Sequence, residues 1–120
     1  MTTDDIGDQL TRWGTVATIE TVGRRTGRRV TAAVGFVESP DGSLLVSAGD
    51  PDADWARNLE LEPSCKVTVG ERRERYLAEP LEGPDRNAAI GALILRYGTP
   101  AEGLGRGPTF RLRPARRTDT

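Results

Sequence analysis

The residues best suited to chemistry lie in one short arginine-rich segment. Four guanidinium groups lie within the seven residues Gly23-Arg24-Arg25-Thr26-Gly27-Arg28-Arg29, two between the glycines and two directly after the second glycine. Glycine allows backbone conformations in which successive amides point inward at an anion, and a guanidinium binds phosphate or carboxylate through two parallel hydrogen bonds. The segment therefore predicts an anion clamp, and the alternative is an ordinary solvated hairpin tip.

Histidine is missing from the chain, and Cys65 is its only cysteine. These counts exclude Ser-His-Asp and Cys-His nucleophile activation and the usual zinc sites, so no metal site is expected. Cys65 precedes Val67 and Val69 in a strand-like run. We therefore expect a buried packing role for this thiol rather than a reactive one.

Length and charge limit the class of protein further. The chain has 120 residues, of which 36% are hydrophobic and 29% charged, and its net charge is -1. No apolar run approaches the roughly 20 residues of a membrane span, and the acidic N-terminus is unlike a signal peptide, so a cytoplasmic protein is expected. A nearly neutral chain also speaks against nucleic acid as a partner, because nucleic-acid-binding domains are strongly basic.

The elements that must position the arginine-rich segment are short strands with two helical interruptions. Alternating and β-branched residues predict strands over Val16–Val22, Val30–Val37, Ser43–Ala48, Cys65–Val69, Arg72–Glu79 and Thr109–Arg113. Helices are expected over Trp55–Leu61 and Pro84–Tyr97. Asp54 is the expected cap of the first helix, and Asn58 is expected to tie that helix to a neighbouring loop.

About six strands with a helix after the third predict a mainly β fold, a small antiparallel barrel with flanking helices. We expect a single domain over residues 1–120, with a flexible or weakly helical N-terminus at 1–12, the barrel at 13–114 and a tail at 115–120. A chain this short leaves part of such a barrel open. Pairing with a second copy closes it, so a homodimer is expected.

Two motifs of the chain occur together in one known family. The first is the arginine-rich turn from Gly23 to Arg28, and the second is the helix motif Trp55-Ala56-Arg57-Asn58-Leu59-Glu60-Leu61-Glu62-Pro63. With the strand hairpin between them, they resemble the deazaflavin-dependent nitroreductase family over roughly Val16 to Pro114. The resemblance implies a split β-barrel of about six antiparallel strands, of the FMN-binding split-barrel type, that binds the 5-deazaflavin coenzyme F420.

The resemblance also implies where the coenzyme lies. The family motif that holds its phosphate and nearby tail is matched by Arg24, Arg25, Thr26, Gly27 and Arg28. The loop at which the backbone approaches its ring system is matched by Ser47, Ala48 and Gly49. Trp55 would lie near the ring, and core packing is the alternative role for this indole.

Departures from the family pattern affect the pocket. Asp50 replaces a glycine of the family and brings negative charge near an acidic coenzyme. Val30 stands where another arginine is usual. Only Tyr97 matches the substrate-side tyrosines, so it is the candidate catalytic proton donor, with solvent as the alternative proton source and core packing as the alternative role of this tyrosine.

The resemblance implies an oxidoreductase that transfers a hydride from the reduced deazaflavin to a small unsaturated, quinone-like or nitro compound. One alternative is a split-barrel protein that binds FMN, haem or another acidic ligand without deazaflavin chemistry. The other is a non-catalytic interaction domain.

Overall fold

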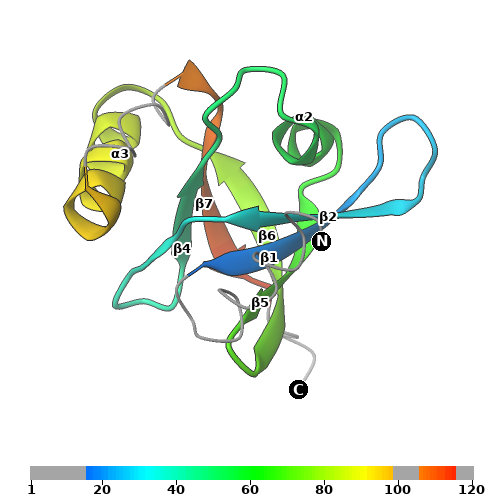
Figure 1. Ribbon diagram of the computed structural model, residues 1–120, viewed down its shortest axis with the longest axis horizontal. Helices are drawn as coiled ribbons and strands as arrows, with labels where there is room; N and C mark the ends of the chain where they lie inside the picture. The colour runs from blue at the N-terminus through cyan, green and yellow to red at the C-terminus, as the bar shows by residue number, and fades with distance from the viewer. Residues whose placement is uncertain (1–15, 99–105, 116–120) are drawn as a thin grey trace, which may run out of the picture.

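The computed structural model of the protein describes residues 16–98 and 106–115. In these two stretches the chain forms one seven-stranded sheet and two α-helices (Figure 1). The strands are β1 (Ala17–Val22), β2 (Arg29–Val34), β3 (Val37–Glu38), β4 (Leu44–Ser47), β5 (Ser64–Val69), β6 (Arg72–Pro80) and β7 (Thr109–Pro114). The helices are α2 (Asp54–Leu61) and α3 (Gly83–Tyr97). The mainly β prediction is confirmed, with seven strands where about six were expected.

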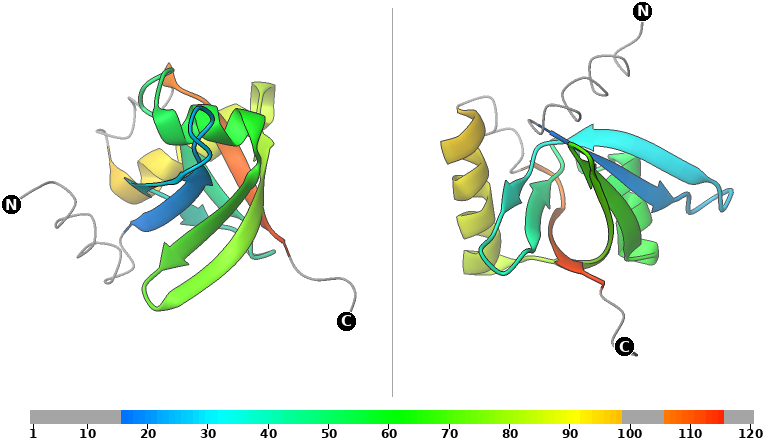
Figure 2. Two further views of the ribbon diagram at one scale, coloured as in Figure 1. Left: turned by 90° about the vertical axis from the view of Figure 1, so that its right-hand side faces the viewer. Right: turned by 90° about the horizontal axis from the view of Figure 1, so that it is seen from below.

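The sheet is antiparallel throughout and has the strand order β2-β1-β5-β6-β7-β4-β3. It curls into an open half-barrel, as the views in Figures 1 and 2 show. Helix α2 packs against β1 and β2, whereas α3 packs against β3, β4 and β7. The two helices therefore cover opposite ends of the curled sheet, and the turn between β1 and β2 lies at the end that α2 covers.

The expected strand Val30–Val37 is divided into β2 and β3 at Gly35 and Phe36. The hydroxyl of Tyr97 donates to the carbonyl oxygen of Phe36 at 3.1 Å and accepts from its amide at 3.0 Å. A Cβ added at Gly35 would lie 3.1 Å from the Tyr97 ring. The phenol thus takes the backbone hydrogen bonds that a neighbouring strand would otherwise make, and the chain crosses between the two edges of the sheet.

The start of α2 differs from the prediction. Ala53 is the N-cap residue and makes no side-chain cap hydrogen bond, while Asp54 lies inside the first turn. The prediction that Asp54 caps this helix is therefore wrong. Its carboxylate still favours the helix electrostatically, because the first turn presents unpaired amide groups and the positive end of the helix dipole.

The main core lies on the inner face of the half-barrel. Its fully buried side chains include Ile19, Leu44, Val46, Phe110 and Leu112. Burying each of these side chains stabilises the fold by about 1.5–3 kcal/mol. A smaller cluster of Leu45, Leu81 and Ala89 fills the space beneath α3. Cys65 is 5% exposed and packs in the main core, so its predicted buried role is confirmed.

Parts of the predicted organisation lie outside the described residues. These parts are the N-terminal segment 1–12 and the tail beyond residue 115. Within the described residues, neither helix combines the length and the apolar character that crossing a membrane requires.

Candidate functional site

The arginine turn closes on itself through its two glycines. The amide of Gly23 donates to the carbonyl oxygen of Arg28 at 2.6 Å, and the amide of Gly27 donates to Gly23 at 2.8 Å. Gly27 has a φ of 73°, a conformation that glycine adopts without steric cost. A Cβ on Gly23 would lie 2.8 Å from the carbonyl oxygen of Arg28, so this position also requires glycine.

Arg24 is committed to holding the turn against α2. Its amide and its Nη1 both donate to Oδ1 of Asn58, at 3.1 Å and 2.9 Å. Its Nη2 lies 3.3 Å from Oδ1 of Asp54. Asn58 is 1% exposed, and its Nδ2 donates to the buried hydroxyl of Thr21 at 3.0 Å. The prediction that Asn58 ties the helix to a neighbouring loop is confirmed, and the loop is the arginine turn.

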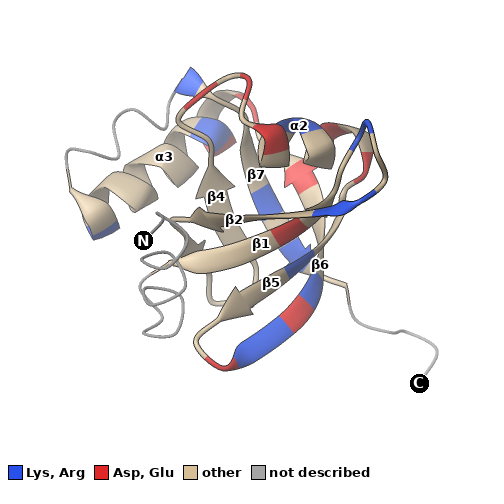
Figure 3. Cartoon of the chain, turned by 45° about the vertical axis from the view of Figure 1, so that its right-hand side comes forward, with Lys and Arg blue, Asp and Glu red and all other residues tan. Residues whose placement is uncertain are grey.

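Arg25 and Arg28 are the two arginines of the turn that point to solvent without a carboxylate. Both are exposed, and neither forms an ion pair with any described residue, whereas Arg29 pairs with Glu20 at 3.0 Å. The amides of Arg25 and Thr26 likewise have no acceptor in the described part of the chain, while Thr26 Oγ1 accepts from the amide of Arg28. Figure 3 shows the positive charge gathered on this turn beside α2. Two guanidinium groups and two amides are therefore the donors that the turn offers to an anion.

The segment Ser47, Ala48 and Gly49 presents little side chain to a ligand. Ser47 is buried and its hydroxyl lies 2.7 Å from that of Thr109. Ala48 is also buried, and its amide donates to Pro108 at 2.9 Å. Gly49 is exposed, so this segment can approach a ligand through backbone at Gly49.

Gly107 packs closely against the backbone of this segment. An added Cβ at Gly107 would meet the carbonyl oxygen of Ala48 and would lie 2.7 Å from that of Asp50. The close approach of these backbones leaves no room for a side chain. Sequence reasoning missed Gly107, because contact between segments so distant in the chain leaves no local pattern.

Asp50 and Trp55 follow this segment along the chain, Asp50 in the loop before α2 and Trp55 within that helix. Oδ1 of Asp50 accepts from the amide of Asp52 at 2.8 Å, so its carboxylate is used within the loop. Trp55 is half-buried in the first turn of α2, and its ring centroid lies 6.2 Å from that of Phe110. One part of the indole therefore packs on the core while another part stays accessible next to the loop.

Tyr97 lies apart from these residues. It belongs to α3, at the other end of the sheet from α2 (Figure 1). Its hydroxyl is engaged by the backbone of Phe36, and the guanidinium of Arg96 lies 5.2 Å from its ring centroid. The structure thus brings together the turn, α2 and the loop before it, and does not bring Tyr97 to them.

A family model described as F420H2-dependent quinone reductase matches residues 1–99 of the chain. No curated protein sequence matches significantly.

Solved structures share the fold at low sequence identity. One is an F420-H2 dependent reductase, FDR-A, with a TM-score of 0.71, 23% identity, and coverage of 82% of this chain and 94% of its own. Another is HutZ, the haem storage protein of Vibrio cholerae, with a TM-score of 0.65, 22% identity, and coverage of 98% and 93%. These likenesses confirm the split β-barrel prediction.

Proposed function

Because this chain belongs to the F420H2-dependent quinone reductase family, we propose that the protein is an oxidoreductase that transfers a hydride from reduced F420 to a small unsaturated, quinone-like or nitro compound. The observation that carries the proposal is the match of the family to residues 1–99, which include the arginine turn and α2. The similar structure of the F420-H2 dependent reductase FDR-A supports it through the fold.

The donors of the turn fit an acidic cofactor. The guanidinium groups of Arg25 and Arg28 and the amides of Arg25 and Thr26 are free to donate to a phosphate or carboxylate of the cofactor. Hydrogen bonds to a charged group contribute about 1.5–3 kcal/mol each, and less where solvent screens them, as it does at this exposed turn. A few such contacts are enough to account for binding of an acidic tail.

F420 supplies the hydride when it is bound in its reduced form. The residues of the chain would position it. Asn58 fixes the arginine turn relative to α2 through Arg24 and Thr21. Trp55 at the start of that helix would cover one side of the ring system, and the backbone at Gly49 would approach it from the loop. Tyr97 is assigned instead to holding α3 against the chain between β2 and β3.

FMN and haem are the alternative ligands. The donors of the turn recognise phosphate or carboxylate and do not by themselves distinguish one acidic cofactor from another.

One similar structure, described as a domain-swapped dimer, covers 92% of this chain with a TM-score of 0.70 at 20% identity. That likeness supports the further proposal of a homodimer, which sedimentation velocity at two protein concentrations would test.

The reaction is tested under anaerobic conditions by mixing the protein with reduced F420 and either a quinone or a nitroaromatic compound. We expect the absorption of oxidised F420 to return faster with the protein than in the buffer blank, in proportion to protein concentration. A rate equal to the blank for both acceptor classes, with F420 shown to be bound, would contradict the proposed hydride transfer. Failure to bind F420 while FMN binds would favour the alternative cofactor.

A further inference from the structure

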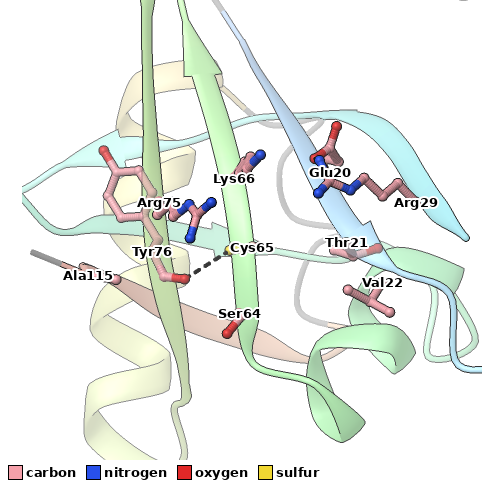
Figure 4. Close-up of a pocket in the computed structure, with 10 residues that line it drawn as sticks. All are labelled: Glu20, Thr21, Val22, Arg29, Ser64, Cys65, Lys66, Arg75, Tyr76 and Ala115. Atoms are coloured by element: carbon pink, nitrogen blue, oxygen red, sulfur yellow. Dashed lines mark hydrogen bonds and ion pairs between the residues drawn. The ribbon is translucent and has the colours of Figure 1, made fainter. Parts of the chain in front are cut away.

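Three strands bring charged side chains into one row on the outer face of the sheet. The register places Glu20 of β1 opposite Lys66 of β5, and Lys66 opposite Arg75 of β6. Side chains that lie opposite each other on neighbouring strands point to the same face and are close enough to interact. The three residues are far apart in sequence, and the pairing of the strands makes them neighbours (Figure 4).

Positive charge exceeds negative charge in this row. The carboxylate of Glu20 is shared by Arg29, at 3.0 Å, and by Arg73 of β6, at 3.4 Å. Lys66 and Arg75 form no ion pair with any residue that the structure describes. The protein thus places four cations around one carboxylate.

The excess of positive charge affects the pKa of Lys66. The positive charge of Arg29, followed by burial and the charges of Arg73 and Arg75, lowers the pKa of the Lys66 amine, and Glu20 opposes this shift only in part. A bound anion would relieve the repulsion among these cations.

A cavity of about 630 Å³ lies over the row. Its charged lining consists of Glu20, Arg29, Lys66 and Arg75, and Val22 joins them at the base of the arginine turn. The volume is within the range of sites that bind small molecules. Cys65 also lines it, but burial raises the pKa of that thiol to about 12, so the thiol is neutral and adds no nucleophile.

We propose that this cavity is a second anion-binding site, separate from the donors of the arginine turn, and that it takes a compact multiply charged group such as a diphosphate or a cluster of carboxylates. Lys66 and Arg75 are the direct contacts, because neither has an ion-pair partner in the described part of the chain. Arg29 contributes charge while it remains paired to Glu20. The proposal goes beyond the cofactor chemistry and does not depend on it.

The sequence offers a specific probe, because Lys66 is the only lysine of the chain. Reductive methylation with ¹³C-formaldehyde labels its amine, and the labelled amine gives an NMR signal distinct from that of the N-terminus. Titration with inorganic pyrophosphate at neutral pH should move the Lys66 signal saturably and raise the pKa of the amine. A Lys66 signal that stays in place throughout the titration would overturn the proposal.

Variants separate the cavity from general attraction between charges. Arg75→Gln should weaken pyrophosphate binding at Lys66 by about tenfold, as expected for the loss of one charge-assisted contact. Glu20→Gln should strengthen it, because the competing carboxylate is removed. Arg57→Gln, which removes the same charge from α2, is the matched control and should leave the Lys66 titration unchanged. Equal effects of Arg75→Gln and Arg57→Gln would overturn the assignment.

Two further titrations identify the source of the anion. If the acidic part of the cofactor reaches the cavity, saturating F420 shifts the Lys66 signal and competes with pyrophosphate. If a separate ligand or the substrate occupies the cavity, pyrophosphate shifts the Lys66 signal equally with and without F420.

Arg25→Gln alters the turn alone and should leave pyrophosphate binding at Lys66 intact. Loss of that binding in Arg25→Gln would contradict a site separate from the turn.

Discussion

Oδ1 of Asn58 accepts two hydrogen bonds from Arg24, one from its amide at 3.1 Å and one from its guanidinium at 2.9 Å. This pairing makes Arg24 a structural residue of the turn and leaves Arg25 and Arg28 as the arginines that can turn to a ligand. The family's two motifs, the arginine turn and the helix motif, are therefore joined physically through one buried amide.

Asn58→Ala should destabilise the protein. The substitution leaves donors of Arg24 and the buried hydroxyl of Thr21 without their partner, which costs about 1–3 kcal/mol in the free energy of unfolding. Urea denaturation measures the change. Arg57→Gln on the same helix is the control, because Arg57 makes exposed ion pairs with Asp52 and Glu60, and a change within about 0.5 kcal/mol is expected. Equal stability of the Asn58→Ala and wild-type proteins would show that the pairing does not hold the turn.

Arg25→Ala and Arg28→Ala should each weaken F420 binding without lowering the melting temperature. Their side chains form no ion pairs in the described structure, so the folded protein loses little when they are removed. A loss of about tenfold in affinity per contact is expected, and added salt should weaken wild-type binding. Lysine at either position should recover part of the affinity, because a point charge does not reproduce the planar fork.

Arg24→Ala should behave differently from these two variants. Arg24 holds the turn through Asn58 and Asp54, so its loss should reduce both stability and cofactor affinity. Isothermal titration and thermal melting on the three variants separate the two effects. If Arg24→Ala alone lost F420 affinity and its stability were unchanged, Arg24 would contact the ligand directly, which would contradict its structural role.

Gly107→Ala should disturb the loop that approaches the proposed ring site. Its Cβ would meet backbone oxygens of Ala48 and Asp50, which cannot move as a flexible side chain can. We expect a loss of stability of about 1 kcal/mol or more and altered amide shifts at Gly49. Gly91→Ala in α3 is the matched control, since nothing lies within 4 Å of its added Cβ. That variant should stabilise the protein by up to about 1 kcal/mol, because alanine favours a helix over glycine.

Much of the fold follows from local pattern. The strands β1, β4, β5, β6 and β7 and both helices lie within a residue or two of the expected ranges, because alternation of apolar residues and the positions of glycine and proline are local signals. The break between β2 and β3 was missed, since it depends on the hydroxyl of Tyr97, 61 residues away from Phe36. A contact at that separation has no trace in the strand pattern.

The site was predictable in part. The glycine-bracketed arginines identify the turn, but the partner of each arginine depends on the tertiary structure. Thr21 gave a usable signal, because a polar residue on the inward face of β1 next to Ile19 requires a buried hydrogen-bond partner. The row of Glu20, Lys66 and Arg75 was not predictable, because strand register creates it.

Stability should fall as the pH rises above about 9. Burial raises the pKa of Cys65 from its ordinary value of 9.0 to about 12, so the unfolded chain ionises its thiol while the folded protein keeps it protonated. The contribution of this thiol to stability is complete below pH 9.0 and is lost as the pH approaches 12. Urea denaturation at pH 7.5, 9.5 and 10.5 should show a shallower decline for Cys65→Ala than for the wild type. Parallel declines would contradict a buried, protonated thiol.

Binding of F420 at the arginine turn is tested most directly by equilibrium titration of F420 and FMN into the wild-type protein and the Arg25→Ala/Arg28→Ala double variant. We predict that the wild type binds F420 more tightly than FMN. The double variant should lose about a hundredfold of F420 affinity at an unchanged melting temperature, as two independent contacts would give. Equal F420 affinity of the two folded proteins would contradict binding at this turn, and tighter binding of FMN by the wild type would contradict the choice of cofactor.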